Sequence, residues 1–201
     1  MGEKAQMISF KCKWFLWFTA ITRCILQLGI PIIGFGYAND DDVLMVKYAD
    51  SLFRMQWLGE YSASAMNKVP GFSLFLALSR FLNISYPMAL GLLYCLAAVI
   101  FFFAIRKLTK NDIVAGVFYL YVLFSPAMMT ANTVQRVYRN SVLPALVLII
   151  VSCYLAMFLE RKCQWKKLIP WSLCCSVFFG FFYIAREDST WLNCFVFGAI
   201  V

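Results

Sequence analysis

Apolar runs of roughly 20 residues recur along this chain, and they constrain its fold more than any other feature. Each run is about long enough to cross a hydrocarbon core of ~30 Å. The chain is 63% hydrophobic and 14% charged, whereas about 25% of the residues of a soluble domain are charged. Because backbone polar groups in lipid must be satisfied within their own segment, the runs predict helices. We therefore expect an all-α, polytopic membrane protein.

Hydropathy predicts about five complete transmembrane helices and a sixth that is cut off, all within one transmembrane domain, 1–201. The predicted spans are 14–36, 86–105, 113–129, 141–159, 168–185 and the incomplete 191–201. No small-residue processing site follows the first span, so we do not expect it to be a signal peptide. The sequence stops inside the last apolar run, and we expect it to be truncated.

Basic residues predict the orientation of these spans. The N-terminal segment and the linkers 106–110 and 161–167 are basic, which is typical of the cytoplasmic side. The segments 37–85, 130–140 and 186–190 are then expected to face outward. The net charge of +8 is explained by this topology, and a nucleic-acid partner is not needed. None of the eight cysteines lies in an outer segment and there is no histidine, which argues against disulfides and zinc.

The long outer loop 37–85 is expected to contain two helices at the membrane surface, 42–57 and 70–82. In the first, apolar residues recur at helical spacing beside a charged stripe. The second follows a Pro-Gly turn and is apolar over most of its length. The expected apolar stripes are Val46, Ala49, Phe53 and Trp57 in the first helix, and Leu74, Ala77, Leu78 and Phe81, as a buried stripe, in the second.

Most acidic residues fall in the outer segments. They are Asp40, Asp41, Asp42, Asp50, Glu60, Glu187 and Asp188. The run of three aspartates begins the first surface helix, where unpaired N–H groups and the helix dipole favour negative charge. Capping needs only one of them, however, and three in a row repel each other. Capping and a functional carboxylate pair both remain open as interpretations.

Basic residues on the outer side run against the usual charge bias of membrane proteins. Arg136 and Arg139 flank Tyr138 between the third and fourth spans, and Arg186 follows the fifth. They can pair with the outer carboxylates, or they can hold an anion such as a phosphate at the membrane surface. The two interpretations are compatible.

The order of these motifs resembles the N-terminal part of the GT-C superfamily of membrane glycosyltransferases, which use polyprenyl-phosphate-sugar donors. Asp41 and Asp42 are followed by Ala49 and Leu52, as in the acidic pair of that family. The stretch KVPGFSLFLAL is similar to its turn and helix, and REDSTWL is similar to an acidic segment of several bacterial members. The resemblance covers about residues 14–200, although members of the family generally have more spans.

The resemblance implies an inverting transfer of a sugar from a polyprenyl-phosphate donor to an acceptor hydroxyl on the outer membrane face. It implies Asp41 as the general base, supported by Asp42. The sequence does not identify the acceptor, which could be a glycan, lipid, wall polymer or protein. We expect a multi-pass protein of a bacterial cell envelope, in the plasma membrane with the N-terminus cytoplasmic. The other implied site residues are Lys68, Arg136, Tyr138, Arg139 and Arg186 for the donor phosphate, and Glu187 and Asp188 for the acceptor or a divalent cation such as Mg²⁺ or Mn²⁺.

Two other classes stay open. The chain can be a non-catalytic membrane assembly protein or a truncated pseudoenzyme, in which the aspartates cap helices and pair with arginines. A transporter or flippase subunit is less favoured, since such proteins carry paired ionisable residues near the middle of their spans. Only Arg23 lies well inside a predicted span, and the sequence does not identify its partner.

Overall fold

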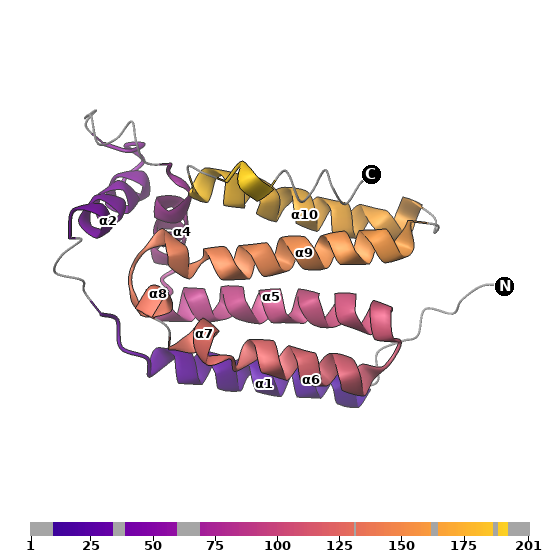
Figure 1. Ribbon diagram of the computed structural model, residues 1–201. Coiled ribbons are helices and arrows are strands. Elements are labelled where there is room, and N and C mark those ends of the chain that lie inside the picture. Colours follow the sequence, from indigo (N-terminus) through magenta and orange to yellow (C-terminus); the bar gives the residue numbers. More distant parts are fainter. Residues whose placement is uncertain are drawn as a thin grey trace.

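The computed structural model describes residues 10–33, 39–59, 69–130, 132–161, 165–186 and 189–192, and every regular element in these ranges is a helix. The all-α prediction is therefore confirmed for this part of the chain. Long helices lie side by side in a bundle, and two shorter ones, α2 and α4, lie across one end of it (Figure 1). The helices are α1 (Phe10–Leu28), α2 (Asn39–Phe53), α4 (Gly71–Phe81), α5 (Tyr86–Thr109), α6 (Asp112–Leu123), α7 (Pro126–Met129), α8 (Asn132–Gln135), the 3-10 helix η2 (Arg139–Ser141), α9 (Leu143–Glu160) and α10 (Trp165–Ala185).

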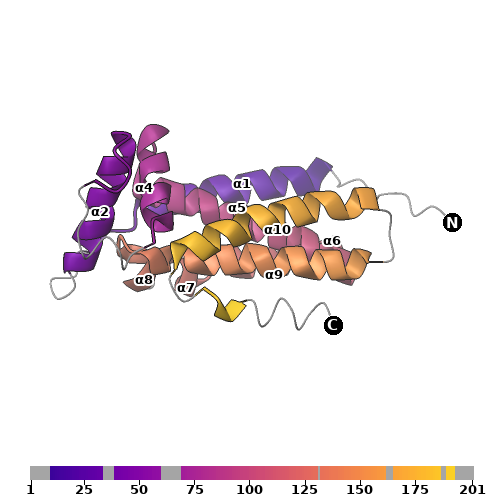
Figure 2. The same ribbon diagram turned by 90° about the horizontal axis from the view of Figure 1, so that it is seen from above.

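The bundle has a simple order. Helix α9 packs between α10 and α5, and α5 in turn packs against both α1 and α6. Helices α1, α6 and α10 end where α2 and α4 lie, whereas α5 and α9 begin there (Figures 1 and 2). We call this the α2–α4 end and the opposite one the basic end. The segments predicted to face outward thus share one end of the bundle, and the basic linkers share the other.

Three of the described helices are long and apolar enough to cross a membrane, namely Tyr86–Thr109, Arg139–Glu160 and Trp165–Ala185. These correspond to the predicted spans 86–105, 141–159 and 168–185. The predicted count of about five complete spans is not confirmed. Helix α1 ends at Leu28, so the predicted span 14–36 is wrong over 29–33, where the described chain is not helical. This helix is long enough to cross but carries three basic residues, and α6 is apolar but short.

The predicted span 113–129 is wrong as a continuous helix. Helix α6 ends at Leu123, and the short α7 starts at Pro126 after a break. Proline has no N–H to donate and disfavours helical backbone in the residue before it. Ser125 accordingly takes an extended conformation, with ψ at 129°. The break leaves carbonyl groups at the end of α6 that need donors from elsewhere.

Arg23 donates to one carbonyl at the end of α6 and to one in α7. Its side chain is fully buried between α1, α5 and α6, at 0% exposure. Nε donates to the Leu123 carbonyl at 2.9 Å and a terminal nitrogen donates to the Met128 carbonyl at 2.8 Å, while the other terminal nitrogen bonds to Gln27. The guanidinium also lies over the Tyr94 ring, 5.9 Å from its centroid. The partners of this buried charge, which the sequence did not identify, are therefore carbonyl and amide oxygens and one aromatic face.

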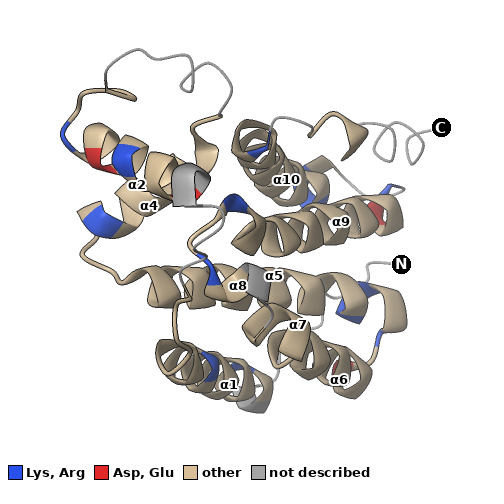
Figure 3. Ribbon diagram, turned by 60° about the vertical axis from the view of Figure 1, so that its left-hand side comes forward, with Lys and Arg blue, Asp and Glu red and all other residues tan. Residues whose placement is uncertain are grey.

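The basic end is closed by a cap and two ion pairs. The Asn111 side chain caps α6, since its Oδ1 accepts hydrogen bonds from the N–H groups of Ile113 and Val114 in the first turn of that helix. Arg106 pairs with Asp112 at 2.5 Å, and Lys107 pairs with Glu160 across α5 and α9. Figure 3 shows that the charged residues lie mostly at the two ends of the bundle and on α2 and α4. This distribution suits a bundle whose middle is surrounded by lipid.

The two surface helices of the first outer loop are found close to their predicted bounds. Helix α2 covers 39–53 rather than 42–57, because the chain turns after Phe53, and α4 covers 71–81 rather than 70–82. The predicted buried stripe of α4 is wrong, since Leu78 and Phe81 are exposed. The buried residues of α4 are instead Gly71, Phe72, Ser73 and Ser79, all of them small except Phe72. Small residues allow close helix–helix contact, whereas large apolar ones can face lipid.

Gly71 fixes α4 against the bundle. A Cβ atom at this position would lie 2.4 Å from the Ile184 carbonyl oxygen and 2.6 Å from the Ala185 nitrogen, at the end of α10. Both are backbone atoms, so they cannot move aside as a flexible side chain can. The glycine of the Pro-Gly pair is therefore required by close packing rather than by a special turn conformation.

Candidate functional site

A bidentate ion pair links the run of aspartates to the loop between α8 and η2. Arg136 Nε lies 2.6 Å from one carboxylate oxygen of Asp42, and its terminal nitrogen lies 2.7 Å from the other. Both side chains are mostly buried, at 18% and 17% exposure. Short, parallel hydrogen bonds between two charged groups define their relative orientation as well as stabilising them. The prediction that outer basic and acidic residues pair is confirmed for Asp42 and Arg136.

A tyrosine and a serine support the backbone that carries this arginine. The Tyr86 hydroxyl, at the start of α5, lies 3.0 Å from the Arg136 carbonyl oxygen and 2.7 Å from Ser141 Oγ. Ser141 Oγ donates to the Tyr138 carbonyl at 2.7 Å, and the Tyr94 hydroxyl donates to the Ser141 carbonyl at 2.8 Å. The loop 136–141 is thereby attached to the first turns of α5, which is one of the long apolar helices.

Tyr138 lies between two guanidinium groups. Arg136 is 4.6 Å and Arg139 is 5.3 Å from the centroid of its ring. A ring face attracts a cation through its quadrupole, so Tyr138 holds two positive groups near each other. The structure therefore brings together three of the residues that the resemblance implied for a donor phosphate.

An apolar groove of about 480 Å³ opens beside this cluster, along α9. It passes from the η2–α9 junction to the middle of α9, with α7 and the end of α10 as its walls. The residues that line it are Met128, Leu143, Pro144, Val147, Leu148, Val151, Phe182, Arg186 and Trp191. Arg186 contributes the only charged group among these lining residues, and it lies just past the end of α10. A groove that is apolar except for a cation near one end suits an anionic lipid.

Several predicted site residues lie outside what the structure describes. Asp41 belongs to the first turn of α2, but its side chain is not described. Lys68, Glu187 and Asp188 fall in ranges that are not described at all. The flanks of those ranges do meet, since Gly71 packs on Ala185. The start of α4 and the end of α10 thus adjoin at the α2–α4 end.

No group of three or more His, Cys, Asp or Glu side chains able to hold a metal ion occurs among the described residues. A divalent cation was predicted only at Glu187 and Asp188, which are outside this set. The predicted cation therefore stays a prediction, and the ion pair of Asp42 supplies positive charge to that carboxylate from the protein itself.

Sequence reasoning missed the supporting residues Tyr86, Tyr94 and Ser141. A tyrosine at the start of a predicted span is typical of the aromatic belt at a membrane interface, so it gave no separate signal. The hydrogen bonds to Arg136 and Ser141 depend on how α5 packs beside α9, which no local pattern encodes.

No protein-family model matches the chain, and no curated protein or solved structure matches it.

Proposed function

We propose that this chain is a membrane glycosyltransferase that moves a sugar from a polyprenyl-phosphate donor to an acceptor hydroxyl at the outer membrane face. The single observation that best supports the proposal is the bidentate pair of Asp42 and Arg136 at the end of an apolar bundle. It holds one carboxylate in a defined position, in the same helical turn as Asp41. The resemblance to GT-C enzymes makes Asp41 the general base.

The reaction needs a base and a stabilised leaving group. The acceptor oxygen attacks the anomeric carbon of the donor sugar, the bond from that carbon to the phosphate oxygen breaks, and the configuration inverts. Asp41 takes the proton of the acceptor hydroxyl, which is the role that the resemblance implies for it. The lipid phosphate leaves with the electron pair of the broken bond.

Cationic groups are needed where the charge of the leaving phosphate develops. Arg136 is already bound by Asp42 through two of its nitrogens, so its main role in this proposal is to position that carboxylate. Arg139 and Arg186, which the resemblance also implies for the phosphate, stay candidates for it among the described residues, with Lys68 as a further candidate. Arg139 lies against Tyr138, and Arg186 lies at the groove.

The groove along α9 suits the hydrocarbon part of such a donor. Its lining is almost entirely apolar, and Leu143, Val147 and Val151 follow one face of a helix that is long enough to cross a membrane. A prenyl chain in this groove would remain at membrane depth while its phosphate reaches Arg186. Glu187 and Asp188, which follow Arg186 directly, are proposed to orient the acceptor or to bind a divalent cation.

Substitution of three aspartates of α2, one at a time, tests the proposal. Wild type, Asp41→Asn, Asp42→Asn and Asp50→Asn are reconstituted in vesicles with a radiolabelled polyprenyl-phosphate sugar and membrane extract as acceptor. Loss of a general base typically costs about 10²–10⁴-fold in rate, so Asp41→Asn should lose transfer but keep donor binding. Asp50 is partly exposed and pairs with Arg54 and Arg80 in the layer formed by α2 and α4. Asp50→Asn is therefore the matched control and should retain activity.

Asp42→Asn separates positioning from chemistry. This change keeps the shape of the side chain and removes the charge that holds Arg136, so transfer should fall while some activity remains. If wild type binds no such donor and turns none over, the enzyme proposal is wrong. If Asp41→Asn transfers sugar as fast as wild type, another group is the base.

A second candidate function is that of a non-catalytic membrane assembly protein. The same ion pair favours it, because pairing with Arg136 already accounts for Asp42 without any chemistry. In that case each aspartate substitution would lower the thermal stability of the chain in proportion to its contacts, and no variant would differ in sugar transfer. Stability and transfer are therefore measured on the same samples.

A further inference from the structure

Large apolar side chains gather at the far end of the α2–α4 layer and are exposed. The most exposed are Met55 at 86% and Phe81 at 70%. We call this set the apolar tip: Phe53, Met55, Trp57, Leu78, Phe81 and Leu82. An exposed cluster of this kind usually marks an interaction surface, whereas single exposed apolar residues need no explanation.

The tip forms because α2 and α4 run in the same direction. Ser73 Oγ donates to the Met45 carbonyl at 3.0 Å near the start of the layer, and Arg80 pairs with Asp50 further along. The C-terminal ends of both helices therefore lie together. Figures 1 and 2 show the pair lying across the end of the bundle instead of continuing along it.

The turn after α2 holds its apolar residues in a costly backbone conformation. Met55 has φ of 60° and Trp57 has φ of 43°, and neither is glycine. Residues other than glycine rarely adopt this left-handed region, which costs on the order of 1 kcal/mol each. Both side chains project outward, so the turn presents them to the surroundings and does not bury them.

The tip lies close to the start of a membrane-spanning helix. Leu82 is four residues before Tyr86, where the apolar helix α5 begins. Four residues reach about 14 Å at full extension, so the tip cannot be far from the level at which α5 enters the hydrocarbon. The short distance between Leu82 and the start of α5 therefore puts the tip near the boundary between lipid and water.

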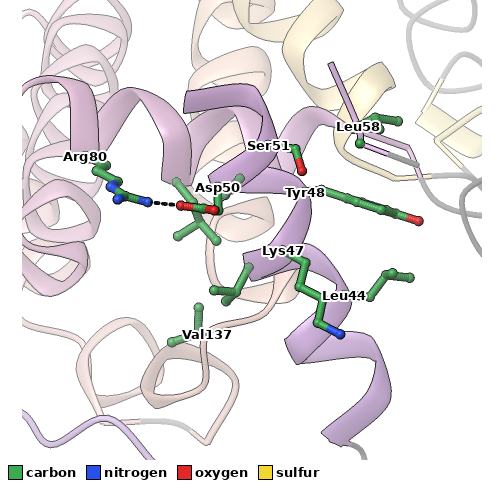
Figure 4. A pocket seen from close by; sticks show the side chains of 12 residues that line it. Leu44, Lys47, Tyr48, Asp50, Ser51, Leu58, Arg80 and Val137 are labelled. Carbon is green, nitrogen blue, oxygen red and sulfur yellow. Dashed lines mark hydrogen bonds and ion pairs between the residues drawn. The ribbon is translucent and has the colours of Figure 1, made fainter. Parts of the chain in front are cut away.

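Charged groups surround the tip in a pattern that fits lipid head groups. Asp50 binds both Arg54, at 2.9 Å, and Arg80, which leaves this trio with one net positive charge. Figure 4 shows Asp50 and Arg80 pointing toward each other between the two helices. The Arg80 guanidinium also covers the Phe53 ring, 4.2 Å from its centroid. Apolar side chains with arginines beside them match the acyl–phosphate boundary of a bilayer.

We propose that the apolar tip inserts into the head-group boundary of the same bilayer that α5, α9 and α10 cross. The insertion fixes the height of α2 above the hydrocarbon. Asp42 lies eleven residues before Phe53 on that helix, about 16 Å along its axis, so the tip would hold the Asp42–Arg136 pair at a constant distance from the lipid surface. This inference does not depend on the proposed glycosyl transfer.

Quenching of Trp57 fluorescence tests the insertion. The full chain and its Trp57→Phe variant are reconstituted in phosphatidylcholine vesicles, and the difference between their emission spectra reports Trp57 alone. Lipids brominated near the head of the acyl chain should reduce this difference emission more than lipids brominated near its middle. Iodide in the water should reduce it little. The measurement is repeated with Leu78→Gln and Phe81→Gln added to both proteins. Trp57 should then be quenched less by the brominated lipids and more by iodide, because a more polar tip prefers water.

Two outcomes would overturn the proposal. Strong iodide quenching with no effect of brominated lipid in the otherwise unchanged chain would place the tip in water. Insensitivity to both quenchers would mean that protein covers it, either a second copy or another part of the same polypeptide. Trp165, exposed at the basic end on the helix α10, serves as the control: its Trp165→Phe difference spectrum should not respond to the Leu78 and Phe81 substitutions.

Discussion

Replacing Gly71 with alanine should release α4 from the bundle. The added methyl group would lie 2.4 Å from the Ile184 carbonyl oxygen and 2.6 Å from the Ala185 nitrogen. Real Cβ atoms do not approach backbone atoms this closely, so either α4 or the end of α10 must shift. Because α10 packs along α9, a shift of α4 is the easier response.

Two effects of opposite sign decide the magnitude. Overpacking of this kind typically costs about 1–3 kcal/mol. Replacing a glycine by alanine inside a helix gains about 0.5–1 kcal/mol, but Gly71 is the first residue of α4, where the gain is smaller. The steric cost should therefore win, with a net loss of about 1–3 kcal/mol. For a chain of this size, that corresponds to a fall in Tm of roughly 3–9 °C.

Gly180 provides the matched control. It lies inside α10, and an added Cβ there would meet nothing within 4 Å. Gly180→Ala should therefore gain helix propensity without overpacking and raise Tm by roughly 2–3 °C. Thermal unfolding of both variants in nanodiscs, followed by intrinsic fluorescence, gives the comparison. A Gly71→Ala variant that unfolds at or above the wild-type temperature would refute the close contact between α4 and α10.

Three further predictions concern charged groups. A double-mutant cycle of stability with Asp42→Asn and Arg136→Gln should give a coupling energy of about 2 kcal/mol, because the pair is bidentate and mostly buried. A coupling energy below about 0.5 kcal/mol would contradict the bidentate geometry. The hydrogen bond from its arginine partner on α4 holds the pKa of Asp50 below its ordinary value. The stability from this contact is thus present above about pH 4 and is lost as the pH falls through the folded-state pKa. In Asp50→Asn, Tm should therefore fall less steeply on acidification than in wild type. The same fall of Tm in both proteins would count against the contact. Arg23→Lys should lower the free energy of unfolding by about 1–3 kcal/mol, since one ammonium group cannot reach all the acceptors of the guanidinium. Arg161→Lys, at an exposed position, is the control and should change it by no more than about 0.5 kcal/mol. Equal losses would mean that the buried contacts are not specific.

The helices could be predicted because the local rule behind them is strong. A backbone surrounded by lipid has to satisfy its own hydrogen bonds, so each long apolar run became a helix wherever the structure describes it. There were two exceptions: the run through 14–36, where the helix ends at Leu28, and the run through 113–129, where Pro126 ends the pattern. The sequence contained that signal, but hydropathy alone averages a single proline away.

The buried faces could not be predicted in the same way. In a soluble protein the apolar face of a helix is the buried one, whereas near lipid an apolar residue can face either the core or the bilayer. On α4 the large residues Leu78 and Phe81 face outward, and Ser73 and Ser79 face the protein. Residue size, which controls how closely helices approach, would have indicated Gly71, Ser73 and Ser79 as buried, but not Phe72, which is buried as well.

The candidate site was predictable as a set of charges but not as a set of contacts. Sequence order and charge placed Asp42 and Arg136 on the same side of the membrane, 94 residues apart. Which carboxylate meets which arginine depends on the path of the loop 136–141, and that path is fixed by hydroxyl groups of Tyr86 and Ser141. These contacts arise only when α5 and α9 pack side by side.

Arg23, the buried charge of α1, is linked through Met128 to the groove along α9. A charge at membrane depth costs roughly 3 kcal/mol, and hydrogen bonds to a charged donor return about 1.5–3 kcal/mol each. With Leu123, Met128 and Gln27 as acceptors, the residue is at least neutral for stability. What it gains for the fold is a fixed break between α6 and α7. The Met128 carbonyl accepts a hydrogen bond from Arg23 while Met128 also lines the groove, so a charge outside the groove helps to hold one of its lining residues in place.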